Sequence, residues 1–318
     1  MRYAVYLPLL FPLLAALAAR PLGERLPPRL ATWMLSAGAL VLAAASTAVL
    51  AMLTTTGLLR FPLLARLAHG HWSAQAAQQH DPASLSVALL AGVLLAAAGA
   101  MAARMAWRRT RALMHAATEA ACLPGHDQLV VVDDPAADAY ALPGRPGRIV
   151  ISTGMLTALN PAEHEVLLAH ERAHLAHHHY LFVASAHLAA AANPLLRPVA
   201  ATVAYTVERW ADESAATHTG DRRRVAHTVG KAALAAKRTT GRAWIPAGAL
   251  GILGRLAPAG PGPIPRRVAA LLAPPPHSHT LTVLVLAGLL LASGLCAAEA
   301  AHDLEALLEL AKHAASRG

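Results

Sequence analysis

The sequence predicts an α-helical membrane protein with four transmembrane helices and a cytoplasmic α+β domain. Of its 318 residues, 56% are hydrophobic and 14% are charged, whereas soluble proteins have about 45–50% and 25%. This low charge excludes a disordered chain. Four uncharged stretches are long enough to approach or cross a hydrocarbon core of about 30 Å. They are residues 3–19, 30–59, 84–103 and 280–298.

The positive net charge is explained better by membrane topology than by a nucleic-acid partner. The chain has 27 basic and 18 acidic residues, a net charge of +9, which in a soluble protein would suggest nucleic acid. Lys and Arg are, however, retained on the cytoplasmic side of membrane helices. Seven arginines follow the first and third apolar stretches: Arg20, Arg25, Arg29, Arg104, Arg108, Arg109 and Arg111. We therefore expect the lipid bilayer as a partner and no direct contact with nucleic acid.

This distribution of charge also predicts the domain boundaries. Residues 1–106 are expected to form three transmembrane helices with short loops, although the first stretch also has features of a signal peptide. Residues 107–279 form the cytoplasmic domain, residues 280–298 form the fourth transmembrane helix, and residues 299–318 form a short extracytoplasmic tail. Both termini are then extracytoplasmic.

The cytoplasmic segment contains two short β-branched runs at residues 128–133 and 148–152. Pro and Gly at residues 143–147 between them predict the turn of a hairpin or meander. The Pro- and Gly-rich residues 257–276 predict a linker back to the membrane.

Two helices are predicted between these features. Asn160, Pro161 and Glu163 combine an Asn cap, Pro at the first helical position and a capping-box acid. They predict a helix over residues 161–178. A second helix is expected over residues 194–217, because an Asn-Pro step precedes it.

The first of these helices contains an HExxH motif formed by His170, Glu171 and His174. Residues i and i+4 share one face of a helix, so both imidazoles can bind one zinc ion at about 2.0 Å. Glu171 is then placed to take a proton from a zinc-activated water. Because the chain has 18 histidines, a solvated His-rich helix is the alternative interpretation.

The second helix offers the third zinc ligand. Glu208 is the better ligand, and Asp212, one turn later, is the better acceptor for the free ring N–H of a ligand histidine. The alternative interpretation is that Glu208 and Asp212 are a pair of surface acids at positions i and i+4 that bind no metal. The apolar residues 181–196 are expected to form a buried or membrane-surface helix. A single crossing there would put Glu208 on the opposite side of the bilayer from the two histidines.

The remaining metal-binding residue types are expected to have other roles. His177, His178 and His179 are predicted to be a polar helix end, where imidazolium complements the helix dipole. Cys122 and Cys296 lack the spacing of a zinc site or a disulfide framework. We expect no metal at five further histidines near the membrane, His69, His71, His80, His277 and His279.

The motifs HERAH and ERWAD resemble those of integral-membrane gluzincins, specifically the BlaR/MecR-type antirepressor metallopeptidases. HtpX and the CAAX prenyl proteases are neighbouring relatives. The resemblance extends over residues 129–220 and implies a zincin-like domain that binds one zinc ion per chain. It implies His170, His174 and Glu208 as the zinc ligands, Glu171 as the catalytic base and Asp212 as the orienting acid.

The resemblance also implies that an edge strand binds the substrate backbone by β-addition. The matching segment is the run Ile149, Val150, Ile151 and Ser152. BlaR and MecR proteins continue into an extracellular penicillin-binding sensor. Only about twenty residues follow residue 298 here, so no sensor of that kind is expected.

These observations predict a membrane-embedded zinc endopeptidase that acts on a cytoplasmic protein. The resemblance implies a substrate such as a winged-helix repressor of the penicillinase-repressor type. The first alternative is quality-control proteolysis of membrane proteins, as in HtpX. The second is a non-enzymatic zinc sensor or carrier, which would require ligands within the membrane. The four apolar stretches contain no His, Asp or Glu, which argues against it.

Overall fold

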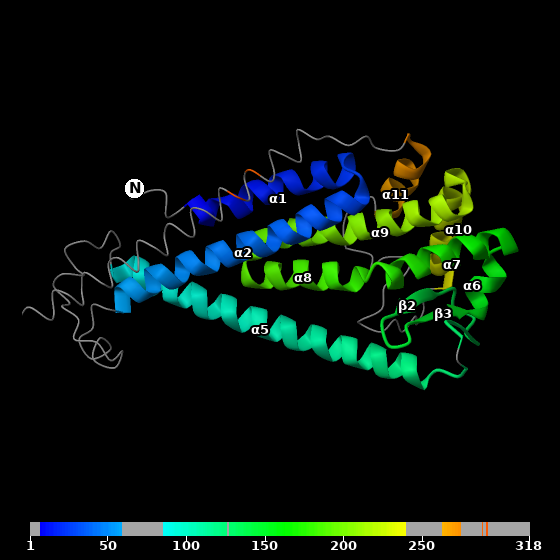
Figure 1. The fold of residues 1–318 in the computed structure, drawn as a ribbon, viewed down its shortest axis with the longest axis horizontal. Coiled ribbons are helices and arrows are strands. Elements are labelled where there is room, and N and C mark those ends of the chain that lie inside the picture. The colour runs from blue at the N-terminus through cyan, green and yellow to red at the C-terminus, as the bar shows by residue number, and fades with distance from the viewer. Residues whose placement is uncertain are drawn as a thin grey trace, which may run out of the picture.

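Long helices form most of the molecule, and a small sheet lies at one end of them (Figure 1). The computed structural model describes residues 7–58, 85–125, 127–239 and 263–274, together with residues 288 and 291. Its first three helices are α1 (Leu7–Arg25), α2 (Pro28–Leu58) and α5 (Leu85–Cys122). The predicted fourth transmembrane helix, residues 280–298, lies outside the described residues apart from 288 and 291.

Two of these helices are long and apolar enough to cross a membrane, Pro28–Thr55 within α2 and Leu85–Cys122, which is α5. By length and composition they suggest a membrane protein. α1 contains most of the first predicted stretch and packs against α2. The 38 residues of α5 measure about 57 Å, roughly twice the hydrocarbon thickness. α5 continues without a break across residue 106, where the sequence predicts a boundary between the membrane region and the cytoplasmic domain.

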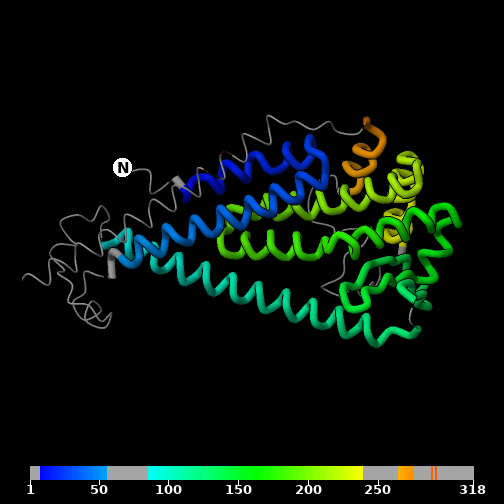
Figure 2. The backbone as a smooth tube through the Cα atoms, in the orientation of Figure 1, coloured from blue at the N-terminus to red at the C-terminus, as the bar shows by residue number. Residues whose placement is uncertain are grey.

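Helices α8 (His179–Ala192) and α9 (Arg197–Thr219) form an antiparallel pair that packs against α1, α2 and α5 (Figures 1 and 2). Asn193 caps the 3₁₀ turn between them by accepting from the Leu195 N–H at 3.1 Å. Its side-chain amide also donates to Ser46 Oγ of α2 at 3.1 Å. The 14 residues of α8 span about 21 Å, which is less than the hydrocarbon thickness of about 30 Å. After α8 the chain reverses direction, and α9 runs back toward the sheet (Figure 1). The turn occupies Pro194–Leu196. The second helix was predicted to begin at residue 194, and α9 begins three residues later, at Arg197.

The sheet consists of β1 (Leu129–Val132), β2 (Ala139–Leu142) and β3 (Arg148–Ser152) in the order β1-β3-β2. β1 is parallel to β3, and β2 is antiparallel to it. The turn at residues 143–147 therefore joins β2 to β3. The predicted hairpin turn is confirmed, but it joins β3 to a strand that the sequence analysis did not identify. The two predicted runs, β1 and β3, pair in parallel and do not form a hairpin with each other.

The predicted edge strand is also wrong, because β3 is the central strand. Its four residues assigned to the substrate edge, Ile149, Val150, Ile151 and Ser152, are each at most 2% exposed. Every residue of β3 is buried, and a continuous apolar run is typical of a strand covered on both faces. The outer strands in the described part of the chain are β1 and β2.

Helix α7 (Pro161–Ala176) packs against the sheet and begins as predicted. Asn160 Oδ1 accepts from the Glu163 N–H at 2.9 Å, and Glu163 Oε2 accepts from the Asn160 N–H at 2.8 Å. This reciprocal pair is a capping box. α7 ends two residues before the predicted position, ahead of His178, which adopts a left-handed φ of 50°.

Three further helices enclose this end of the molecule: α6 (Thr153–Ala158), α10 (Arg222–Thr239) and α11 (Pro263–Leu272). α11 occupies part of the predicted linker. Its prolines, Pro263 and Pro265, lie in the first turn, where Pro is compatible with a helix. α11 packs against α9 and α10, so a segment expected to be a linker forms part of the folded core.

Candidate metal centre and active site

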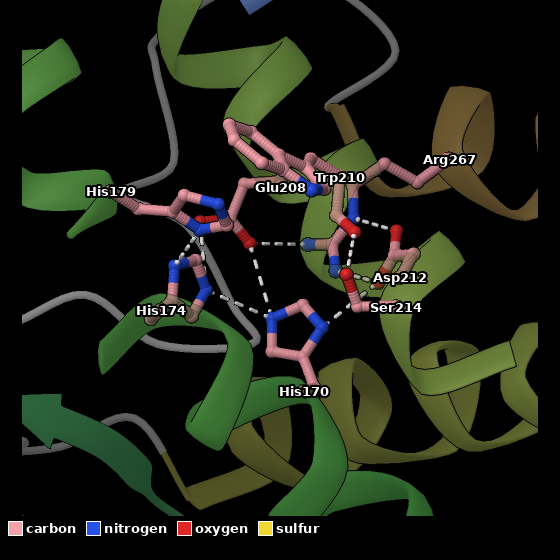
Figure 3. A network of polar contacts seen from close by, with 8 residues as sticks. All are labelled: His170, His174, His179, Glu208, Trp210, Asp212, Ser214 and Arg267. Atoms are coloured by element: carbon pink, nitrogen blue, oxygen red, sulfur yellow. Dashed lines mark hydrogen bonds and ion pairs between the residues drawn. The ribbon is translucent and has the colours of Figure 1, made fainter. Parts of the chain in front are cut away.

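Helices α7 and α9 bring three metal-binding side chains to one buried point (Figure 3). His170 and His174 lie one turn apart on α7, with their Nε2 atoms 3.1 Å apart. Glu208 of α9 has one carboxylate oxygen 3.6 Å from His170 Nε2 and the other 3.7 Å from His174 Nε2. One ligand atom from each residue lies within 4.8 Å of the others.

This arrangement fits a zinc ion. Two ligands at about 2.0 Å in tetrahedral geometry are about 3.3 Å apart, close to the separations between the two imidazoles and the carboxylate. All three side chains are buried, and two imidazoles with one carboxylate are a ligand set that leaves a fourth position open for water or substrate. His170, His174 and Glu208 could therefore hold zinc with only small adjustments.

Two further acids lie around this point. Asp212 Oδ1 is 3.1 Å from His170 Nδ1, on the side of the ring opposite the ligand atom. It can therefore accept the ring N–H and fix the tautomer that leaves Nε2 free to bind metal. Glu171 adjoins His170 on α7 and is fully buried, so both acids expected from the sequence lie at the cluster.

Arg267 of α11 is the residue at this site that the sequence did not reveal. It is 1% exposed, and its Nε and Nη2 donate to the two carboxylate oxygens of Asp212 at 2.8 and 2.6 Å. Its Nη1 lies 3.0 Å from Glu208 Oε2. A planar guanidinium thus holds the carboxylates of Glu208 and Asp212 in place. Its position in a Pro-rich segment gave no sequence signal for this role.

His179 is a second residue whose role the structure changes. It begins α8 and is fully buried, and its Nδ1 lies 3.0 Å from His174 Nδ1. If His174 binds metal through Nε2, its ring proton is on Nδ1. This N–H can then donate a hydrogen bond to Nδ1 of His179. His177 stacks on Trp210 at 4.8 Å between ring centroids. His177 is nevertheless the exposed C-cap of α7, so the predicted polar helix end holds for its position, although burial lowers its pKa and disfavours the imidazolium form. The prediction is wrong for the buried His179.

The electrostatics of the cluster keep its carboxylates ionised. Burial alone would raise the pKa of Glu208 and of Asp212, but Arg267 outweighs it and lowers both. Burial also opposes charge on His170, but Asp212 and Glu208 raise its pKa to about 9. The ionised carboxylates of Glu208 and Asp212 are thus compensated by Arg267 and by the His170 imidazolium, and Glu208 is in the charged form that binds a metal ion.

The other two histidines favour the neutral state. Burial lowers the pKa of His174 and lowers the pKa of His179 to about 3. Neutral imidazole is the form that binds metal or accepts a hydrogen bond. Both groups are thus in the state that the geometry requires.

A comparison with protein families bears directly on this geometry. Residues 103–233 match peptidase family M48. The matching segment contains α7, α8 and α9, and with them His170, His174, Glu208 and Asp212. The M48 match supports a zinc metalloprotease of the membrane type and does not distinguish the antirepressor branch. Comparisons with curated proteins and with solved structures found no match.

Proposed function

We propose that this protein is a zinc-dependent endopeptidase whose active site lies at the cytoplasmic face of a membrane. The observation that carries the proposal is the buried cluster of His170, His174 and Glu208, whose ligand atoms lie within 4.8 Å of one another. The M48 match over the same helices supports it. α2 and α5, which are long and apolar enough to span a bilayer, support the membrane location.

In this proposal each residue of the cluster has a distinct role. His170, His174 and Glu208 would hold zinc, which would supply a Lewis acid for the scissile carbonyl and lower the pKa of the attacking water. Glu171 accepts a proton from that water and then donates it to the leaving amine nitrogen. Asp212 keeps the proton of His170 on Nδ1, and Arg267 holds Asp212 in position.

The substrate is proposed to bind as an extended chain. An extended peptide can add to an open sheet edge through main-chain hydrogen bonds. β2 is an outer strand, and it packs against the helix that carries the HExxH motif. We assign the binding edge to β2, in place of β3.

The substrate itself is proposed to be a cytoplasmic protein, and a winged-helix repressor of the penicillinase-repressor type is the leading candidate. The resemblance of the HERAH and ERWAD motifs to antirepressor peptidases supports this assignment. Cleavage of such a repressor would switch on transcription. The M48 match is equally compatible with quality-control cleavage of membrane proteins, which remains the second candidate.

The test compares cells that express the full-length wild type, Glu171→Gln or Glu165→Gln. Glu165 is the matched control, because it lies on α7 with a side chain that is 55% exposed. New protein N-termini would be mapped in each strain. We expect cleavage products in the wild type and the control that are lost in Glu171→Gln. A soluble repressor among the products supports signalling, and membrane proteins support quality control. Identical N-termini in all three strains would contradict the proposal.

A further inference from the structure

A cavity of about 400 Å³ lies between α5, α8 and α9 and shares no residue with the metal cluster. This volume is within the range of about 300–1,000 Å³ that is usual for small-molecule sites. Three helices contribute basic side chains to its wall: Arg104 and Arg108 from α5, Arg197 from α9, and His187 from α8. The remaining wall is apolar and consists of Met101, Met105, Ala190, Ala191, Ala200 and Ala201.

The charge on this wall is not neutralised within the described part of the chain. No carboxylate lines the cavity, and none of the three arginines forms an ion pair with another described residue. Three guanidinium groups around one hollow repel one another, and a bound anion would relieve that repulsion. Guanidinium binds phosphate through paired, charge-assisted hydrogen bonds.

The place of the cavity along α5 indicates which phosphate it meets. Arg104 directly follows the uncharged residues 84–103 of the predicted third span, so it lies where a helix leaves the hydrocarbon. Trp107 is 65% exposed on the same turn of α5, and Trp is enriched at membrane interfaces. Leu90 and Val93, earlier on α5, are 60% and 66% exposed, as lipid-facing side chains would be.

We infer that this cavity binds the phosphate headgroup of an anionic phospholipid in the leaflet that faces the catalytic domain. Arg104, Arg108 and Arg197 contact the phosphate. Met101 and Met105 provide an apolar surface for the start of an acyl chain. A free phosphate ion would use the arginines but would gain nothing from the methionines.

A lipid at this position would link the membrane to the catalytic helices. Arg197 is the first residue of α9, the helix that carries Glu208 and Asp212. Arg104 and Arg108 belong to α5. A shared headgroup therefore joins α5 to the beginning of α9 and stabilises the α8–α9 pair against the membrane helix.

The experiment measures lipid binding to the full-length protein in detergent by native mass spectrometry. The probes are phosphatidylglycerol, phosphatidylcholine and inorganic phosphate. The test variant is Arg104→Gln/Arg108→Gln/Arg197→Gln. The matched control, Arg145→Gln/Arg223→Gln/Arg238→Gln, removes the same charge from three other exposed arginines. Both sets can be made with or without Glu171→Gln, so binding is measured independently of proteolysis.

We expect the wild type and the control to retain phosphatidylglycerol in preference to phosphatidylcholine. The test variant should bind it about 100-fold more weakly, roughly fivefold for each arginine. Equal retention of the two lipids, or unchanged binding by the test variant, would overturn the inference. Inorganic phosphate that displaces phosphatidylglycerol at equal concentration would overturn the lipid assignment and indicate a free-phosphate site. Circular dichroism checks that each variant is folded.

Discussion

At the scale of single residues, each histidine of the proposed metal site has a polar partner at its Nδ1 atom, on the side of the ring away from Nε2. Asp212 lies 3.1 Å from Nδ1 of His170, and His179 lies 3.0 Å from Nδ1 of His174. Both contacts leave the Nε2 atoms facing Glu208. Partners of this kind fix the tautomer and the orientation of a ligand imidazole. The two supports differ in chemistry, since one is a carboxylate and the other is a neutral imidazole.

Replacing His179 with Phe should weaken zinc binding. Phe keeps a ring of similar size but leaves the His174 N–H buried without an acceptor. Loss of such a supporting contact typically costs about 10- to 100-fold in metal affinity. Competition with a chromogenic chelator would measure it. His178→Asn is the control, because His178 is exposed and Asn tolerates its left-handed backbone. Equal affinities of the two variants would show that His179 does not support the site.

Asp138, on the chain just before β2, predicts a pH dependence of stability. It is 8% exposed, and one carboxylate oxygen has no hydrogen-bond partner. Burial raises its pKa from 3.8 to about 6. Protonated Asp138 is therefore favoured in the folded state, and the associated stability is lost as the pH rises from about 4 through 6.

Asp138→Asn should consequently be more stable than the wild type above pH 6, by on the order of 3 kcal/mol. The difference should become small at pH 4, where the carboxyl is protonated in the folded state and close to its pKa of 3.8 in the unfolded state. Urea unfolding at pH 4, 6 and 8 would measure it. A gain that is the same at all three pH values would rule out titration of Asp138 as its cause.

At the scale of helices, the site is built from α7, α9 and α11. The motifs on α7 and α9 are visible in the sequence because metal ligands have fixed helical spacing. The capping box of Asn160 and Glu163 is equally local, and the structure confirms it. α11 was not predicted, because its two prolines are typical of a linker. The role of Arg267 was not predicted either, because its partners Asp212 and Glu208 lie 55 and 59 positions away in the sequence.

Arg267→Met should destabilise the protein strongly. It removes a buried cation and leaves Glu208 and Asp212 uncompensated, which typically costs about 3–5 kcal/mol. Zinc should recover part of this loss, because it supplies positive charge beside Glu208. Thermal unfolding with and without zinc would measure both effects. The neighbouring Arg266→Met is the control, since Arg266 pairs with the partly exposed Glu24. Similar losses in the two variants would contradict a special role for Arg267.

The sheet shows a different limit of sequence-based prediction. The positions of β1 and β3 are evident from their β-branched runs, but their parallel pairing depends on β2, which lies between them in sequence. Ala139–Leu142 contains two alanines and has little β-propensity. It is a strand because it pairs with β3. Strand order is thus set by tertiary pairing, and the edge assignment was wrong for that reason.

At the scale of the whole molecule, the helices α1, α2 and α5 and the site helices form one unit. Arg209, next to the proposed ligand Glu208, donates to the Gly23 carbonyl at 2.6 Å. A Cβ at Gly23 would clash with the side chain of Thr202 of α9, so α1 and α9 are in close contact there. The α8–α9 pair is enclosed by α1, α2 and α5. The residue beside the proposed ligand Glu208 is therefore tied directly to the N-terminal helix.

The proposed topology can be tested through Cys122, which is an exposed free thiol at the end of α5. In a Cys296→Ser background, a membrane-impermeant maleimide should leave Cys122 unlabelled in intact cells and label it after permeabilisation. This result is expected because the catalytic domain is proposed to be cytoplasmic. Labelling of intact cells would place the domain on the opposite side.

The central claim is that His170, His174 and Glu208 hold a catalytic zinc ion, and zinc stoichiometry together with peptidase activity tests it most directly. Both would be measured on purified wild type, Glu208→Gln, Glu171→Gln and the control Glu213→Gln. We expect about one zinc per chain and cleavage in the wild type and the control. Glu171→Gln should keep its zinc and lose about 10²- to 10⁴-fold in rate. Glu208→Gln should lose both zinc and activity. A wild type without zinc, or a Glu208→Gln variant that binds zinc and cleaves normally, would contradict the claim.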